Sequence, residues 1–125
     1  MITTSPLLVS ILRQGDHLLA SINAALDDSE MLRFQEALVD RIGEERARGV
    51  IVDVAALDVL DSFGARTLGT IAEIARLRGA ETVIVGVSPE IAFTMVRLGM
   101  AIPHVHTALD LEQGLQLLSR LTQPS

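Results

Sequence analysis

The chain of 125 residues contains no cysteine, tryptophan, tyrosine or lysine. Without cysteine it can form no disulfide, no thiolate metal site and no thiol nucleophile, and this composition fits a cytoplasmic protein. Its three phenylalanines offer little surface on which bases or sugars could stack. We therefore expect a hydrophobic core built from leucine, isoleucine, valine and alanine.

The charge is acidic, with a formal net charge of −6 and a pI of about 4.9. All ten basic residues are arginines, and they are scattered rather than clustered. Binding to nucleic-acid phosphates needs clustered cations, so a nucleic-acid partner is not expected. The first residues lack the basic segment of a signal peptide, and the apolar runs are strand-sized, which predicts no membrane partner.

The length and composition predict one folded domain spanning residues 1–125. Hydrophobic residues make up 49% of the chain and charged residues 21%, which excludes a disordered chain. Hydrophobic periodicity predicts strands at 7–13, 18–23, 50–54, 82–87 and 105–106, and helices at 30–48, 62–78, 88–99 and 110–121. The order ββαβαβαβα indicates an α/β fold, with helices packed on a mixed, mostly parallel sheet of about five strands.

Two helix-terminal patterns are informative. Arg48 and Gly49 are typical of a helix end, so we expect the helix 30–48 to close there with glycine in the left-handed conformation. Ser62 stands where a short loop after the buried strand 50–54 meets the next helix. In a parallel sheet, ligands and chemistry collect at the carboxyl ends of strands. A helix start also offers unpaired N–H groups that suit a phosphate.

Two interpretations of Ser62 remain open from this local pattern. Serine at a helix start is most often an N-cap, and Asp61 could be the cap instead. Alternatively, Ser62 is a phosphorylation site, where the added charge of about −1.5 to −2 would act on a face that already carries Asp58 and Asp61.

The run VIVDVAALDVLDSFGARTLG resembles the signature of STAS domains, which occur in anti-sigma-factor antagonists and sulfate transporters. The segments RGAETVIVGVSPEIAFTMVRLGM and HTALDLEQGL also resemble this family, so the likeness covers nearly the whole chain. Within the family, the ALDDSE, Asp61-Ser62-Phe63, GVSPEIAFTMVRLGM and TALDLEQGL segments are similar to the small stand-alone stressosome antagonists.

The resemblance implies a non-enzymatic scaffold subunit of a bacterial stressosome. It implies that Ser62 is phosphorylated by a GHKL-type switch serine kinase, that a PP2C-like phosphatase reverses this, and that phosphorylation releases the kinase. It also implies a large hetero-oligomer with sensor paralogues that carry C-terminal STAS domains, or a homo-oligomer. The early first strand is expected to leave no room for a sensory domain here. Asp58, Asp61, Phe63 and Arg66 are the expected partner-binding residues.

Three other functions compete with this one. The nearest alternative is a stand-alone anti-sigma-factor antagonist that binds an anti-sigma kinase directly, and the second is a small-ligand or nucleotide-binding module. The sequence contains no glycine-rich phosphate loop, which disfavours the second. A hydrolase nucleophile at Ser62 is disfavoured because LDSFG is not a G-x-S-x-G elbow, so no catalytic residue and no cofactor are expected.

Some further side chains have two interpretations each. An Asp53, Asp58 and Asp61 cluster or a His104-x-His106 pair could bind a metal, although acidic docking and ordinary surface roles are expected instead, and no metal site is predicted. Ser29 is a candidate second phosphosite. Three apolar residues are candidates for either an exposed docking patch or the core, namely Phe93, Met95 and Met100.

Overall fold

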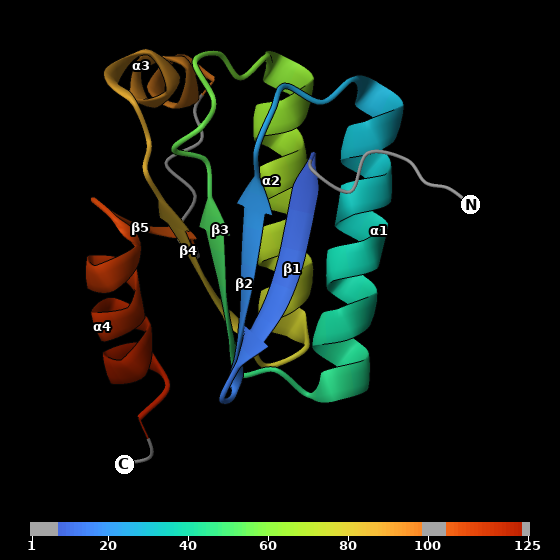
Figure 1. Ribbon diagram of the computed structural model, residues 1–125, viewed down its shortest axis with the longest axis vertical. Helices are drawn as coiled ribbons and strands as arrows, with labels where there is room; N and C mark the ends of the chain where they lie inside the picture. The colour runs from blue at the N-terminus through green and yellow to red at the C-terminus, as the bar shows by residue number, and fades with distance from the viewer. Residues whose placement is uncertain (1–7, 99–104, 124–125) are drawn as a thin grey trace.

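The computed structural model in Figure 1 describes residues 8–98 and 105–123, and they form a five-stranded sheet in the order β1-β2-β3-β4-β5. The β1–β2 pair is antiparallel, and the other neighbouring pairs are parallel. The strands are β1 (Val9–Gln14), β2 (His17–Ile22), β3 (Gly49–Asp53), β4 (Glu81–Val85) and β5 (Val105–Ala108). This topology confirms the predicted element order and the mixed, mostly parallel sheet.

Helices cover both faces of the sheet. The helices are α1 (Asp28–Glu45), α2 (Ser62–Leu77), α3 (Pro89–Arg97) and α4 (Leu111–Leu121). Figure 1 shows α1 and α2 side by side on one face, α4 on the other face over β3 to β5, and α3 across the end of the sheet where the parallel strands finish. That end also carries the start of α2, so the fold places the loop before Ser62 at the carboxyl edge of the strands.

Strand alternation divides the core into two layers. Val50 and Val52 of β3 face α1 and α2, whereas Ile51 faces α4 and packs in the same cluster as Leu118. The predicted buried stripe of α1 is confirmed, since Met31, Phe34, Leu38 and Ile42 are all buried. The predicted stripe of α4 holds only in part, because Leu118 is buried while Leu111, in the first turn, is 39% exposed.

The predicted end of the first helix is wrong. Helix α1 ends at Glu45, and Arg46 rather than Gly49 takes the left-handed conformation, with φ = 51°. Gly49 instead begins β3, where a Cβ would lie only 2.6 Å from a methyl carbon of Leu118. Glycine is therefore required at position 49 by the close approach of α4, and α1 has ended before this residue.

The structure adds detail at the other expected boundaries. Strand β4 stops at Val85 because Gly86 has φ = 78°, a left-handed conformation that breaks the extended backbone. Val105–Ala108 confirms the expected edge strand. Gly99, Met100 and His104 lie outside the described residues. Over residues 8–98 and 105–123, no helix is both long and apolar enough to span a bilayer.

Candidate functional site

Ser62 is the first residue of α2, and its side chain is exposed. The loop that leads to it follows β3, and helix α2 then runs back along the sheet. The hydroxyl lies at the surface and not in the hydrophobic interior, so a modifying protein has physical access to it.

Asp61, and not Ser62, is the N-cap of α2. The Asp61 carboxylate accepts a hydrogen bond of 2.7 Å from the Gly64 N–H, and the Asp61 carbonyl accepts one of 2.9 Å from the Ala65 N–H. This geometry decides between the two interpretations of capping, because the Ser62 hydroxyl is not the capping group. The N–H groups of Ser62 and Phe63 precede the first intrahelical bond, so they have no acceptor within the helix and are available to an anion.

We predict that replacing Asp61 by alanine lowers the free energy of unfolding by about 1 kcal/mol, because the Gly64 N–H loses its acceptor. An Asp61→Asn change should retain most of the stability, since the amide oxygen can accept the same bond. Urea denaturation of the three proteins measures this. Equal losses for alanine and asparagine would show that the charge, and not the cap, stabilises the helix start.

The loop before Ser62 is held at both ends. The Val54 N–H donates to the Val85 carbonyl of β4 at 3.0 Å, and Leu57 and Leu60 are buried in the core. The Asp53 carboxylate accepts from the Ala55 N–H at 2.9 Å, which fixes the first turn of the loop. Such a loop presents Ser62 in a defined position, because its neighbours on either side cannot move freely.

The loop also contacts the next loop along the sheet edge. At Gly86, which follows β4, a Cβ would lie 2.6 Å from the Ala55 Cβ and 2.8 Å from the Ala55 backbone. The Gly86 N–H in turn donates to the Leu109 carbonyl, which follows β5, at 3.2 Å. Gly86 thus joins the loops that follow three neighbouring strands, a role that was not predicted. The available signal was a single glycine directly after a β-branched strand.

The predicted partner-binding residues have different exposures. Asp58, Asp61 and Arg66 are exposed, and Arg66 lies one turn beyond Ser62 on the same helix. Phe63 is half-buried and packs against the core, so only part of its ring is available to a partner. Within the described ranges, no three His, Asp or Glu side chains are grouped to hold a metal ion.

The carboxyl end of the sheet carries an excess of acidic residues. Counting the strand ends, loops and adjoining helical turns at this end, nine carboxylates accompany three arginines, an excess of six that equals the formal net charge of the chain. The acids are Asp27, Asp28, Glu30, Asp53, Asp58, Asp61, Glu90, Asp110 and Glu112, and the arginines are Arg33, Arg66 and Arg97. A phosphate at Ser62 would therefore add charge where the molecule is already most negative.

Ser29, the other candidate phosphosite, differs from Ser62. Its hydroxyl donates to the Asp27 carboxylate at 3.0 Å, within the capping box that Asp27 and Glu30 form at the start of α1. The Glu30 N–H, together with Ser29, holds the pKa of Asp27 below its usual value. The Ser29 hydroxyl is thus engaged with an ionised carboxylate, whereas Ser62 has no capping role.

Neither described histidine is placed to act on Ser62. His106, in β5, lies 3.3 Å from the Glu81 carboxylate at the start of β4, and His17 begins β2. Both sit toward the amino ends of the parallel strands, opposite to Ser62. Over the residues that the structure describes, the arrangement does not supply a histidine base for a serine nucleophile.

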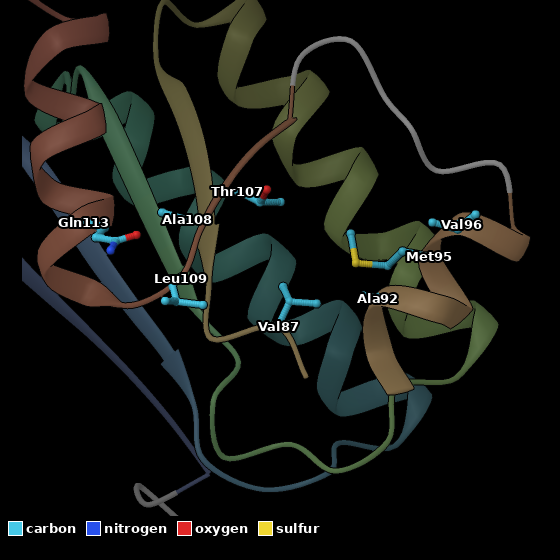
Figure 2. A pocket seen from close by; sticks show the side chains of 8 residues that line it. All are labelled: Val87, Ala92, Met95, Val96, Thr107, Ala108, Leu109 and Gln113. Carbon is cyan, nitrogen blue, oxygen red and sulfur yellow. The ribbon is translucent and has the colours of Figure 1, made fainter. Parts of the chain in front are cut away.

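A cavity of about 610 Å³ opens beside the same edge of the sheet, between α3 and the junction of β5 with α4 (Figure 2). Its lining residues are Val87, Ala92, Met95, Val96, Thr107, Ala108, Leu109 and Gln113. Phe93 and Met95 were each candidates for an exposed patch or for the core, and the structure separates them. Phe93 is 64% exposed, whereas Met95 is buried and lines the cavity. Sequence periodicity could not reveal this cavity, since it forms between elements that pack only in three dimensions.

Comparison with solved structures shows what this arrangement is similar to. RsbS from Moorella thermoacetica, in a form with a serine-to-glutamate substitution, has a TM-score of 0.83 at 34% identity, over 93% of this chain and 98% of that one. A chain from a structure of the stressosome, a signal integration and transduction hub, has a TM-score of 0.75 at 29% identity, over 92% of this chain and all of that one. The anti-sigma factor antagonist SpoIIAA shares the fold, with a TM-score of 0.69 at 14% identity over 93% and 99% of the two chains.

Sequence comparison agrees with the structural likeness. The RsbT co-antagonist proteins RsbRA and RsbRD of Bacillus subtilis are 31% and 28% identical over 78% and 72% of this chain. This chain covers only 35% and 32% of the lengths of those two proteins. The family model for the STAS domain matches residues 9–113. The strand, loop and Asp-Ser helix start described above are therefore those of a STAS domain, and the chain belongs to that family.

Proposed function

We propose that the chain is a scaffold subunit of a stressosome-type assembly that holds a serine-protein kinase and releases it when Ser62 is phosphorylated. The observation that carries the proposal is the exposed Ser62 hydroxyl at the first position of α2, next to an aspartate that already caps the helix. The likeness to RsbS and to a stressosome chain supports it. The subunit binds and is modified, and it performs no catalysis of its own.

The electrostatics supply a mechanism for release. A serine hydroxyl can be buried in a close-packed interface at little cost, whereas a phosphate of charge about −1.5 to −2 must be desolvated and paired to be buried there. The free N–H groups of Ser62 and Phe63 and the exposed guanidinium of Arg66 offer the phosphate partners within the chain itself. Phosphorylation thus disfavours the kinase-bound state and stabilises the released one.

The proposed partners follow from the same comparisons. The named relatives RsbRA and RsbRD are co-antagonists of RsbT, so we propose that longer sensor paralogues with C-terminal STAS domains assemble with this chain. A switch serine kinase of the GHKL type and a PP2C-like phosphatase complete the cycle. The proposal places the chain in the cytoplasm, where the kinase obtains its ATP.

Light scattering coupled to size-exclusion chromatography tests the assembly. We expect this chain and a sensor paralogue to elute together as a particle much larger than either alone, to retain the kinase, and to lose it after phosphorylation. The stand-alone antagonist alternative predicts a small complex of this chain with the kinase in the absence of any paralogue. A nucleotide-binding role is disfavoured. The lining of the cavity between α3 and the β5–α4 junction is mostly apolar, and the neighbouring acids Asp110 and Glu112 would repel the phosphates of a nucleotide.

The role of Arg66 gives a separate prediction. An exposed phosphoserine loses its second proton with a pKa of about 6. Asp58 and Asp61 disfavour the dianion of a phosphate on Ser62, whereas free amides and Arg66 favour it, so we expect Arg66→Gln to raise the pKa of the phosphate above its wild-type value. A ³¹P NMR titration of phosphorylated wild-type and variant chains measures the shift. Arg33→Gln, in the second turn of α1, is the matched control and should change nothing.

A further inference from the structure

The cavity between α3 and the β5–α4 junction has an apolar interior and an apolar mouth. Met95 is buried in it, while Val96 and Leu109 line it and are each 74% exposed. Figure 2 shows the α3 side chains on one side, Val87 between, and on the other side Thr107, Ala108, Leu109 and Gln113. A volume of about 610 Å³ lies within the range of about 300–1,000 Å³ that is typical of ligand sites. Large exposed apolar side chains around such a cavity mark a binding surface.

Acidic side chains outnumber basic ones among the residues that directly flank the cavity lining. Asp110 and Glu112 directly flank the lining residues Leu109 and Gln113, and both acids are exposed. Arg97 also flanks a lining residue, Val96, but its guanidinium lies over the Phe93 ring at 5.6 Å from the ring centroid. These acids belong to the end of the molecule that carries six more carboxylates than arginines. These features favour an occupant that is apolar where it enters the cavity and cationic where it meets the first turn of α4.

We infer that this cavity binds a basic amphipathic segment of a partner protein. Apolar side chains from one face of the segment enter between Val96 and Leu109, and its lysine or arginine side chains pair with Asp110 and Glu112. This is the helix-in-groove mode of recognition, in which apolar anchors give affinity and flanking charges give orientation.

The same charges disfavour the other possible occupants. A second copy of this chain in a two-fold dimer would bring the same patch to both sides, so that the acidic residues of both copies would share one interface. A fatty acid or an anionic membrane surface would bring negative charge to these carboxylates. A cationic segment is the occupant that gains from both the apolar and the acidic features.

This site goes beyond the proposed switch, because binding here needs no phosphate on Ser62. The two are nevertheless joined through the backbone, since Gly86 contacts Ala55 in the Ser62 loop and donates to Leu109 at the mouth of the cavity. A partner that binds the cavity therefore lies along the same edge of the sheet as Ser62.

The test uses the full chain and a synthetic helical peptide of about 14 residues, or about four turns, with leucines on one face and lysines on the other. Fluorescence anisotropy of the labelled peptide gives the affinity. Two control peptides have the same leucines with glutamates in place of lysines, or the same composition in an order that spreads the leucines around the helix. We expect saturable binding of the first peptide alone, with an affinity that falls as salt rises.

Variants locate the site. Leu109→Ser and Val96→Ser should each weaken binding about tenfold, because each removes an apolar contact. The matched control is Leu77→Ser, since Leu77 is 81% exposed but sits at the far end of α2. Glu112→Gln with Asp110→Asn, which keeps the cap acceptor, should weaken binding severalfold and flatten its salt dependence, whereas Glu44→Gln should not. Circular dichroism and urea denaturation confirm that each variant is folded.

Three results would overturn the inference. One is binding of the glutamate peptide or of the scrambled peptide as tightly as the lysine peptide. Another is unchanged affinity in Leu109→Ser. The third is a concentration-dependent dimer, seen by light scattering, that Leu109→Ser abolishes, because a second copy would then be the occupant. None of these outcomes depends on Ser62 phosphorylation, so a failure of this inference would leave the Ser62 proposal unaffected.

Discussion

Replacing Ser62 by alanine is expected to abolish phosphorylation of this chain by its cognate switch kinase while leaving the fold intact. The serine side chain is exposed and is not the cap of α2, so its removal costs little stability. It is also the one hydroxyl that we assign to the switch. Intact-mass spectrometry after incubation with kinase and ATP should show one added phosphate on the wild-type chain and none on Ser62→Ala.

Ser29→Ala is the matched control for that experiment. Ser29 is likewise an exposed serine in the first turn of a helix, but its hydroxyl donates to Asp27. We expect this variant to accept one phosphate as the wild type does. A phosphate that persists in Ser62→Ala and disappears in Ser29→Ala would move the switch to α1 and refute the assignment.

Aspartate at position 62 is expected to imitate the phosphate only in part. It carries one negative charge and two oxygens, whereas the phosphate carries a charge of about −1.5 to −2 and three terminal oxygens. Kinase retention by Ser62→Asp should therefore fall between those of the unmodified and the phosphorylated chains. Release equal to that of the phosphoprotein, measured by the same co-elution assay, would contradict this mechanism.

Replacing Gly86 by alanine is expected to destabilise the fold more than removal of the Asp61 cap does. The residue has φ = 78°, which costs an ordinary side chain about 1–2 kcal/mol. The new Cβ would also lie 2.6 Å from the Ala55 Cβ, and forcing apart such a packed contact costs about 1–3 kcal/mol more. Urea denaturation should therefore show a loss of about 2–5 kcal/mol.

Gly79→Ala separates the two causes. Gly79 has a similar φ of 84°, but a Cβ there would have no atom within 4 Å. The free energy of unfolding of Gly79→Ala should fall only by the cost of the left-handed backbone, about 1–2 kcal/mol. Hydrogen exchange should also show faster opening of residues 54–61 in Gly86→Ala but not in Gly79→Ala, since only Gly86 touches the Ser62 loop. Equal losses in both variants would mean that the contact with Ala55 is unimportant.

The sequence by itself determined the elements and their order. Helical spacing placed Met31, Phe34, Leu38 and Ile42 in the core, because α-helical geometry puts residues three and four apart on one face. β-Branched runs placed the central strands, and the position of Ser62 at a helix start after a buried strand followed directly from the order of the residues. The family likeness rested on the same segments and is confirmed by the STAS domain match over residues 9–113.

Only the tertiary structure decided the questions that depend on contacts between distant segments. Local pattern could not say whether Asp61 or Ser62 caps α2, since both residue types favour that position and the choice depends on the path of the loop. Gly49 looked like a helix end, but it is required by the approach of Leu118 from a helix far along the chain. The cavity beside α3 and the junction at Gly86 likewise arise where separate loops meet. Short-range spacing determines which face of an element is apolar, whereas packing determines which atoms remain free at the surface.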